Sequence, residues 1–434
     1  MFGDDVSAVV VDVGSCTSRF GYAGEDCPKI SHPSVIAVGD NMDSMKKARF
    51  PLNPFVCLDK MDIRPLMSTS PLGDEAEWVQ TLDSDVFEVI VEKSIVKGPA
   101  GLGVEPSNHP FLLTEPTRHN TKLRQKMAEV MFEKFSPPAL FLAKQAVLTG
   151  FANGRSSALI LDIGASQTTC TPIYDGYALQ KNLKEAPVGG DFLDLELLEE
   201  VLAQTGREVT PHFQYKKRVQ MPDPETDPDG FARIVSRREV DMSSVESSYR
   251  NWARMEVVRE MKETMCSVAE SEDEAERPPV SAPSNVVEPY TLPDGTEIQP
   301  GPYMYTIAER LFRPSLFKSK SLKGFNGLPK MICNTILGSD TDLRKDLLSA
   351  VIITGGSSYL RGLSERVTRS LHAPDLIGAS QKFKIIAPSS GTERKFSAWI
   401  GGSILASLGS FHQMWISKQE YEEHGLAITE RKCP

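Results

Sequence analysis

The sequence predicts an α/β protein built from two similar lobes. Its 434 residues are more than one ordinary hydrophobic core accommodates, so at least two lobes are expected. One strand-to-glycine unit occurs twice, at 9–17 and at 159–168, with Asp12 and Asp162 in matching places 150 positions apart. Short aliphatic runs alternate with segments of helical apolar spacing between and after the two units, as in an α/β fold.

The elements of the first half follow from local patterns. The β-branched run 7–14 and residues 19–22 predict two strands, and 111–115 predicts a third. Apolar residues at helical spacing predict helices over 77–93, 124–135 and 140–151, the last of which ends in the C-cap signal Asn153-Gly154. The stretch 39–64, which contains Pro51 and Pro54, predicts an irregular excursion.

A second strand-and-hairpin unit begins at residue 158. A helix is expected over 256–269, a hairpin with a Pro-Asp-Gly turn over 290–298, and the end of a helix over 343–349. A third strand then leads into Gly355-Gly356, without an aspartate. The polar stretch 207–248 reads as an insertion, and 270–289, acidic and then rich in Pro and Ser, as a mobile surface loop.

The chemistry of the repeated unit favours phosphate binding. Gly14 and Gly164 allow a tight turn that comes close to a ligand, and successive N–H groups with the Ser15 or Ser166 hydroxyl form an anion-binding nest. A strand-end aspartate suits Mg²⁺ or Ca²⁺, usually through water. One Asp-x-Gly alone is more often only a β-turn. Two copies in the same context favour a nucleotide phosphate held from both sides.

Composition excludes several classes of function. The net charge of -10 and the pI near 5.4 argue against autonomous binding to nucleic acid, which requires a basic face. The seven cysteines lack CxxC or zinc spacing and are expected to be reduced thiols. No signal peptide is expected at the start, and the longest apolar stretch, 399–411, is too short to span a bilayer.

Several long strings carry a resemblance to a known family. They are 21–29, 172–179, 342–347 and 399–408, followed by 413–423 and the closing Arg-Lys-Cys-Pro. On these strings the chain resembles actin and the actin-related proteins over nearly its whole length, and it is most similar to the nuclear members. The excursions at 39–64, 207–248 and 270–289 fall outside the resemblance. It implies an α/β, actin-like ATPase fold: two duplicated RNase H-like lobes, four subdomains and a nucleotide in the central cleft.

The resemblance also implies where the four subdomains lie. Subdomain 1 is expected at 1–33, 71–152 and 397–434, and subdomain 2 at 34–70. Subdomain 3 is expected at 153–190 and 312–396. Subdomain 4 is expected at 191–311, with insertions near 207–248 and 270–289.

The family's nucleotide site carries over position by position, and ATP with Mg²⁺ or Ca²⁺ is the implied ligand. Arg19 stands where the family has a lysine, and its planar guanidinium differs from a point charge. Without the resemblance, Lys262, Glu263 and Lys395 would pass for solvated surface charge and Gln145 for an ordinary helix residue. The positions expected to bind nucleotide are Asp12, Gly14, Ser15, Arg19, Asp162, Gly164, Lys262, Glu263, Gly355, Gly356, Ser357, Tyr359 and Lys395, with Asp12 and Asp162 holding the metal through water.

Three departures from the family pattern fall around the expected site of hydrolysis. Ala165 replaces an aspartate, Thr169 replaces a histidine that orders the attacking water, and Cys16 replaces a glycine. Gln145, which helps to place that water, is retained. Each such group contributes roughly 10²–10⁴-fold to catalysis, so the sequence predicts ATP binding with little or no hydrolysis and no catalytic residue. Slow hydrolysis, rescued by neighbouring groups, is the alternative.

The resemblance implies a nuclear protein in chromatin-remodelling and histone-acetyltransferase complexes. Its expected partners are nuclear actin and a long helix of a scaffold or motor subunit, with histones or the nucleosome as further candidates. The apolar segments 150–153 and 405–415 suit such a helix, although core packing also explains apolar residues there. Segments 42–60 and 317–325 differ from the filament contacts of actin, so a monomer is expected.

Three rival functions remain open at this point. The first is a polymerising, cytoskeletal actin-like ATPase. The second is a sugar- or acetate-kinase-like enzyme, which needs a carboxylate base near the second hairpin, where the sequence offers no candidate. The third is an Hsp70-like chaperone, which needs a substrate domain beyond the nucleotide lobes.

Overall fold

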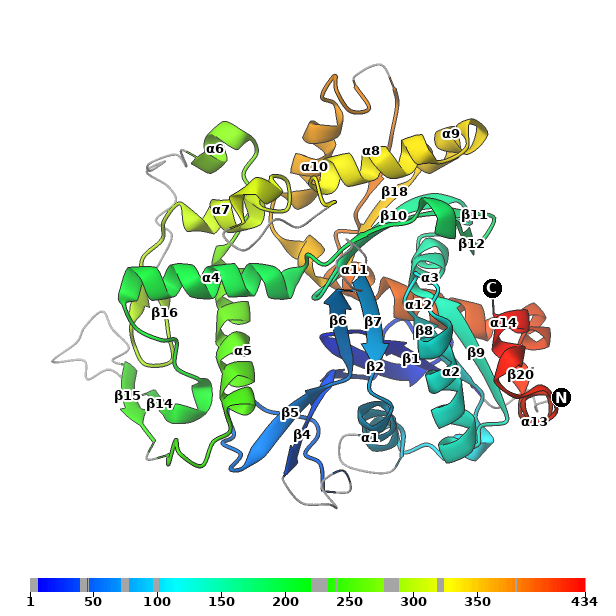
Figure 1. Ribbon diagram of the computed structural model, residues 1–434, viewed down its shortest axis with the longest axis horizontal. Coiled ribbons are helices and arrows are strands. Elements are labelled where there is room, and N and C mark those ends of the chain that lie inside the picture. The colour runs from blue at the N-terminus through cyan, green and yellow to red at the C-terminus, as the bar shows by residue number, and fades with distance from the viewer. Residues whose placement is uncertain are drawn as a thin grey trace.

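Two lobes, each built on its own sheet, lie side by side in the computed structural model (Figure 1). The structure describes residues 7–39, 45, 47–71, 78–96, 101–219, 233–238, 240–276, 289–317, 324–378 and 381–433. Over these residues, no helix combines the length and the apolar character that crossing a bilayer requires.

The first sheet has the strand order β20-β9-β8-β1-β2-β3. Its central strand β1 (Val9–Val13) pairs antiparallel with β2 (Thr17–Tyr22) and parallel with β8 (Phe111–Glu115). Every residue of β1, β8 and β9 (Ala139–Lys144) is buried, because helices cover both faces. The outer strands are β3 (Ile30–Pro33) and β20 (Ile416–Ser417).

The second sheet repeats this arrangement. Strand β10 (Ala158–Ile163) pairs antiparallel with β11 (Thr168–Tyr174) and parallel with β18 (Val351–Thr354). Strands β12 (Tyr177–Ala178), β13 (Lys184–Ala186) and β19 (Ile385–Ile386) complete it. Asp12 lies opposite Arg19 in the first hairpin, as Asp162 lies opposite Thr169 in the second. The matching register confirms the duplication that the repeat predicted.

Each sheet has its own hydrophobic core, and helices α3 (Gln145–Ala152) and α12 (Ser397–Ser407) pack together where the chain passes between the lobes. Their backbones are close: a Cβ on Gly401 would lie 1.8 Å from the Leu148 carbonyl oxygen. Trp399 is fully buried and donates its indole N–H to the Val10 carbonyl oxygen at 3.1 Å. Helix α12 is therefore packed tightly against both α3 and strand β1.

The remaining helices flank the two sheets or, like α5 and α6, lie away from them (Figure 1). They are α1 (Ser84–Ile95), α2 (Thr121–Val130), α4 (Gly190–Thr205), α5 (Ser247–Met265), α6 (Glu272–Glu276), α7 (Tyr303–Glu309), α8 (Leu328–Gly338), α9 (Thr341–Ser349), α10 (Leu363–Leu371), α11 (Gly391–Lys395), α13 (Lys418–His424) and α14 (Ile428–Lys432). In the part of the chain that the structure describes, four two-stranded sheets pair β4 (Val35–Gly39) with β5 (Met61–Pro65), β6 (Met67–Pro71) with β7 (Trp78–Leu82), β14 (Tyr215–Val219) with β15 (Arg233–Arg237), and β16 (Tyr290–Thr291) with β17 (Glu297–Ile298).

Two predicted helices were wrong over their first halves. Residues 78–82 form strand β7, and the helix begins only after Asp83, whose carboxylate caps the N–H groups of Asp85 and Val86. Residues 139–144 form strand β9, whose six side chains are all buried. A continuous apolar run fits a buried strand as well as a helix, and only pairing with β8 decides between them.

The predicted excursions are partly regular. Strands β4 and β5 border the irregular stretch after Gly39, of which 40–44 and 46 lie outside the described residues. The segment 207–248 contains β14 and β15, and 270–289 contains α6, so neither is wholly loop. Also outside the described residues are 220–232, 239, 277–288 and 318–323. They include parts of both insertions and of the segment 317–325, which differs from a filament contact of actin. The four subdomain boundaries stay a prediction.

Candidate functional site

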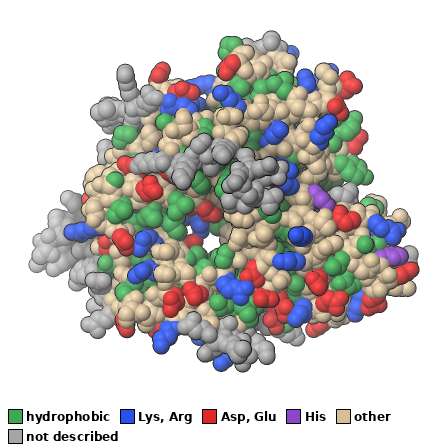
Figure 2. Space-filling model, in the orientation of Figure 1, with side chains coloured by type: hydrophobic (Ala, Val, Ile, Leu, Met, Phe, Trp, Pro, Cys, Tyr) green, Lys and Arg blue, Asp and Glu red, His purple; other side chains and the backbone are tan. Residues whose placement is uncertain are grey.

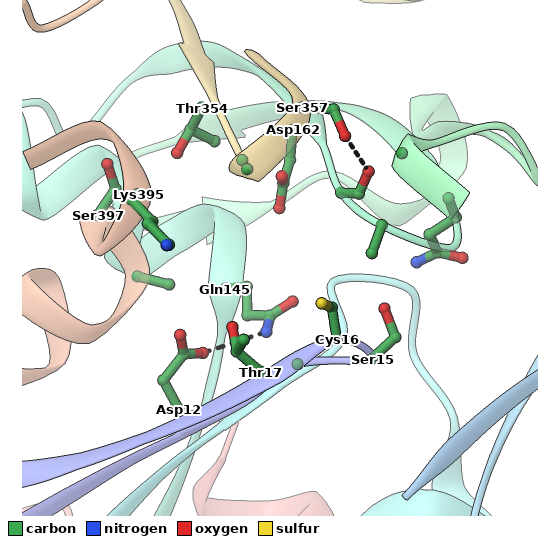
Figure 3. A pocket seen from close by; sticks show the side chains of 18 of the residues that line it. Asp12, Ser15, Cys16, Thr17, Gln145, Asp162, Thr354, Ser357, Lys395 and Ser397 are labelled. Carbon is green, nitrogen blue, oxygen red and sulfur yellow. Dashed lines mark hydrogen bonds between the residues drawn. The ribbon is translucent and has the colours of Figure 1, made fainter. Parts of the chain in front are cut away.

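A cavity of about 820 Å³ lies between the lobes, where Figure 2 shows the molecule hollowed near its centre. The first hairpin and Gln145 line one side, and the second hairpin with the Gly355-Gly356 turn lines the other (Figure 3). All the positions predicted to bind nucleotide line this one cavity. They are Asp12, Gly14, Ser15, Arg19, Asp162, Gly164, Lys262, Glu263, Gly355, Gly356, Ser357, Tyr359 and Lys395, together with Ala165 and Thr169.

The glycine of each hairpin is required by the close approach of its own turn. A Cβ on Gly14 would lie 2.7 Å from the Thr17 carbonyl oxygen, and a Cβ on Gly164 would lie 3.0 Å from the Gln167 carbonyl oxygen. The residues that follow Gly14 face the cavity, among them Cys16, whose thiol pKa is raised by burial. The two glycine turns are therefore alike in their close backbone approach, and they lie on opposite walls of the cavity.

Asp12 is fully satisfied by protein groups. Its carboxylate forms an ion pair with Arg19, the residue opposite it in the hairpin. Its other oxygen accepts hydrogen bonds from the Thr114 hydroxyl at 2.7 Å and from the Gln145 amide at 3.3 Å. Arg19 also donates to the Thr17 hydroxyl at 2.9 Å and lies over the Phe396 ring. Arg19 is thus paired with Asp12 in this structure, and its contact with a phosphate stays a prediction.

The surroundings of the Asp162 carboxylate differ from those of the Asp12 carboxylate. No described residue donates a hydrogen bond to it, and its enclosure, with a smaller contribution from Asp12, raises its pKa to about 6 against the opposing effect of Arg19. Gly355 leaves it room, since a Cβ there would lie 2.3 Å from the Asp162 Oδ1 atom. The free lone pairs of Asp162 therefore face the cavity.

These donors fit a hydrated divalent cation. The described residues contain no group of three or more His, Cys, Asp or Glu side chains placed to hold a metal. Mg²⁺ is typically bound by one or two carboxylates together with water and substrate phosphates, and Ca²⁺ also takes oxygen ligands. Asp162, with Asp12 behind it, supplies such a partial set. An ion at this place would depend on the phosphates of a nucleotide for its remaining ligands.

The basic groups on the α5 side of the cavity are already paired. Lys262 forms an ion pair with the buried Asp194 at 2.7 Å and donates to the Gly190 carbonyl oxygen at 2.9 Å. Arg259 pairs with Glu256 at 2.5 Å and with Asp191 at 3.2 Å. These pairs leave little uncompensated positive charge for a polyphosphate.

Sequence reasoning missed Arg259, Glu256 and Asp191, which also line the cavity. A signal was present for Arg259, because it lies three residues before Lys262 and so on the same face of α5. For Asp191 the only signal was the Gly189-Gly190 pair before a helix. A Cβ on Gly189 would lie 2.3 Å from the Ala165 carbonyl oxygen, so α4 must begin against the second hairpin.

Tyr359 and Lys395 lie together at the far end of the cavity. The Tyr359 hydroxyl donates to the Gly391 carbonyl oxygen and accepts from the Lys395 backbone N–H at 3.1 Å. Arg394 stacks over the Tyr359 ring with its guanidinium carbon 5.2 Å from the centroid. The ring is held in place before any ligand arrives. An aromatic ring that lines the cavity together with a lysine suits a nucleotide base.

At the two substituted positions of the second hairpin, no carboxylate or imidazole is present. Ala165 follows its glycine, and Thr169 lies across the strand pair from Asp162. Among the described residues that line the cavity there is no histidine. The Gln145 amide nitrogen is held by Asp12 and by the Val13 carbonyl oxygen at 3.2 Å.

Duplicated lobes with paired Asp-Gly hairpins around a nucleotide-sized cavity define an actin-like class of protein, and the chain belongs to the actin family: the family model described as Actin matches residues 3–434. It is 35% identical to Actin-related protein 4 of Oryza sativa subsp. indica over 461 residues, covering 100% of this chain and 99% of the relative. It is also 35% identical to Actin-related protein 4 of Arabidopsis thaliana, with 100% and 99% covered. The SWI/SNF and RSC complexes subunit arp42 of Schizosaccharomyces pombe is 30% identical, with 99% and 100% covered.

Proposed function

We propose that this chain is a nuclear, non-catalytic scaffold subunit of chromatin-remodelling and histone-acetyltransferase complexes that binds ATP as a structural ligand. The names of its relatives support this role, since several are called Actin-related protein 4 and one is named as a subunit of the SWI/SNF and RSC complexes. The observation that carries the nucleotide part is the single cavity lined by both Asp-Gly hairpins, without a base beside Ala165.

Nucleotide and cation act together in this proposal. When bound, Mg²⁺ or Ca²⁺ offsets the negative charge of the phosphates. Asp162 holds its water shell, and Gly14 and Gly164 let the turns reach the phosphates. Tyr359 and Lys395 contact the base. A ligand that binds only the folded protein stabilises it by mass action, so ATP strengthens the closed form of the two lobes.

Removing the divalent cation is expected to release the nucleotide. Arg19, Arg259 and Lys262 are each paired with carboxylates. Lys395 is the remaining basic side chain among the described residues that line the cavity, and it is assigned to the base, so little free positive charge remains to hold the phosphates alone. Bound nucleotide is measured after EDTA treatment and gel filtration, with Mg²⁺-treated protein as the control. ATP is expected to fall from about one per chain to a small fraction. Full retention in EDTA contradicts the electrostatic argument.

Phosphate release is expected to stay at background in the unmodified protein. Ala165 and Thr169 supply neither a carboxylate nor an imidazole, each of which typically contributes roughly 10²–10⁴-fold. The double variant A165D/T169H is expected to raise single-turnover phosphate release by at least about tenfold, with ATP affinity little changed. Sustained release from the unmodified protein overturns the proposal of a non-catalytic site.

The partner side of the proposal rests on an apolar surface beside α3 and α12. Ile404, Leu408 and Met414 are exposed large hydrophobic residues, and Phe411 packs edge-on against Phe141. An amphipathic helix of a scaffold or motor subunit, shared with nuclear actin, fits such a surface. Histones or the nucleosome are further candidate contacts.

Tagged protein isolated from nuclei tests the assembly. Nuclear actin and a remodeller or acetyltransferase subunit are expected to co-purify in fixed ratio. The rival function is a polymerising ATPase of the cytoskeleton. Sedimentation in polymerising salt separates the two, since the proposed scaffold subunit stays a monomer in the supernatant. Pelleted polymer with phosphate release supports the rival.

A further inference from the structure

Helix α4 has two separate apolar stripes. The first, which is buried in the core of the second lobe, is Leu193, Leu197 and Val201. The second is Leu195, Leu198 and Leu202, which share another face of the helix because they are spaced i, i+3 and i+7. We call these three residues the leucine seam. A helix that is apolar on all sides is normally a buried helix, so the seam predicts a covering partner.

The described part of the chain leaves the leucine seam open. The exposed fraction is 52% for Leu195 and 46% for Leu202, while Leu198 is half-buried against the core. Figure 2 shows hydrophobic side chains gathered to the left of the hollow, where α4 crosses the front of the molecule in Figure 1. Exposed leucines scattered singly are common on protein surfaces, but leucines in register on one helix face mark a contact surface.

Leu316 widens this apolar surface beside α4. Its exposed fraction is 38%, and its neighbour Phe317 packs edge-on against Phe192 of α4 with 5.1 Å between ring centroids. Arg310 connects the two segments, since it forms an ion pair with Glu196 of α4 at 3.2 Å and donates to the Leu316 carbonyl oxygen at 3.3 Å. The surface is therefore held in place by packing and by a buried ion pair.

The charge beside the leucine seam is negative. The charged residues of α4 are all acidic: Asp191, Asp194, Glu196, Glu199 and Glu200. Asp194 and Glu196 are buried and paired with Lys262 and Arg310. Glu199 is exposed next to the seam, and no described residue forms an ion pair with it. A partner that covers the seam therefore meets an unpaired carboxylate at its edge.

We propose that the leucine seam docks an amphipathic helix of a partner protein, with Lys or Arg beside the apolar stripe of that helix. The spacing of the seam is that of positions a, d and a in a coiled coil, and Glu199 then occupies position e, where charges select the partner. From Leu195 to Leu202 the axis rises about 10.5 Å, which is about two turns of contact. A second copy of α4 would bring like charges together, so a basic partner is the better match.

This inference goes beyond the proposed function and rests neither on ATP binding nor on the surface beside α12. The probe is a fluorescein-labelled peptide of about three heptads with Leu at a and d and Lys at e and g, titrated with the full chain and followed by anisotropy. A peptide with Glu in place of Lys is the comparison. The Lys peptide is expected to bind at least about tenfold more tightly, and E199K is expected to reduce this preference at least about threefold.

The variant L202Q tests the seam itself. Its matched control is L337Q, because Leu337 on α8 is also an exposed leucine near the end of a helix, with an exposed fraction of 57%. The Lys peptide is expected to bind L202Q at least about fivefold more weakly than the unmodified chain, and L337Q within about twofold of it. Both variants are expected to melt within about 2 °C of the unmodified chain. A large drop for L202Q alone means that Leu202 packs inside the folded chain and overturns the proposal.

The remaining outcomes separate other occupants of the surface. Binding that is lost in L408Q but kept in L202Q places the peptide on the surface beside α12 and overturns the inference without touching the proposed function. Sedimentation equilibrium that finds a dimer of the unmodified chain and a monomer of L202Q makes a second copy the occupant. Equal affinity of both peptides, or a Lys peptide that binds the unmodified chain, L202Q and E199K alike, reduces the effect to general attraction and overturns the seam.

Discussion

The variant D162N is expected to bind Mg²⁺-ATP roughly 10- to 100-fold more weakly while its empty form becomes more stable at neutral pH. The two effects have one origin. Asp162 receives no hydrogen bond from the described residues and lies close to Asp12, so its negative charge is unfavourable until a cation arrives. Asparagine removes that charge and with it the ligand that faces the cation's water shell.

The raised pKa of Asp162 determines at which pH D162N is more stable than the unmodified protein. The folded-state pKa of Asp162, about 6, lies above the unfolded value of about 3.9, so the folded protein binds the proton more tightly. The corresponding stability is fully present below about pH 4 and is lost as the pH rises to about 6. At pH 7 the charged carboxylate costs roughly 1–2 kcal/mol after allowance for solvent, and D162N recovers it.

Thermal melts of nucleotide-free protein at pH 4 and pH 7 check the stability effect. The difference between D162N and the unmodified protein is expected at pH 7 and should vanish near pH 4. The exposed Asp346 on α9 supplies the matched control D346N, for which neither stability nor ATP affinity is expected to change much. Equal ATP affinity of D162N and the unmodified protein in Mg²⁺ contradicts the assigned role of Asp162.

The variant G355A is expected to lose ATP binding and about 2–4 kcal/mol of stability. Gly355 has φ +91° and ψ 157°, a region that only glycine adopts readily. Its added Cβ would lie 2.3 Å from Asp162 Oδ1 and 2.4 Å from the Ile163 carbonyl oxygen. Both neighbours belong to the second hairpin, so the clash displaces the free carboxylate as well as straining the turn.

The control G206A separates backbone strain from the clash. Gly206 ends α4 at φ +65°, and a Cβ there would meet no heavy atom within 4 Å. It is expected to cost about 1 kcal/mol and to leave ATP binding intact. Urea unfolding and isothermal titration with Mg²⁺-ATP measure both variants. If G355A loses no more stability than G206A and still binds ATP, the close approach of Gly355 to Asp162 is not a constraint on the site.

The sequence by itself determined the duplicated plan of the molecule and the positions of its cavity. A strand, an aspartate and a glycine turn are encoded within about ten residues, so Asp12 and Asp162 were recognisable without any knowledge of the partner segments. The resemblance to actin added Lys262, Tyr359 and Lys395, which no local pattern marks, and the structure places all three in the same cavity. Their roles toward ATP remain predictions.

Only the tertiary structure decided what depends on contacts between distant segments. Residues 78–82 and 139–144 become strands because neighbouring strands pair with them, whereas their apolar spacing also fits helices. The ion pairs of Arg19 with Asp12 and of Lys262 with Asp194 form because folding brings together residues of different strands and helices. The Ile63 N–H donates to the Ser248 hydroxyl oxygen across 185 positions, and no periodicity in the sequence predicts such a contact. Local patterns specify turns and strands, but the partners of a charge or a hydroxyl are set by packing.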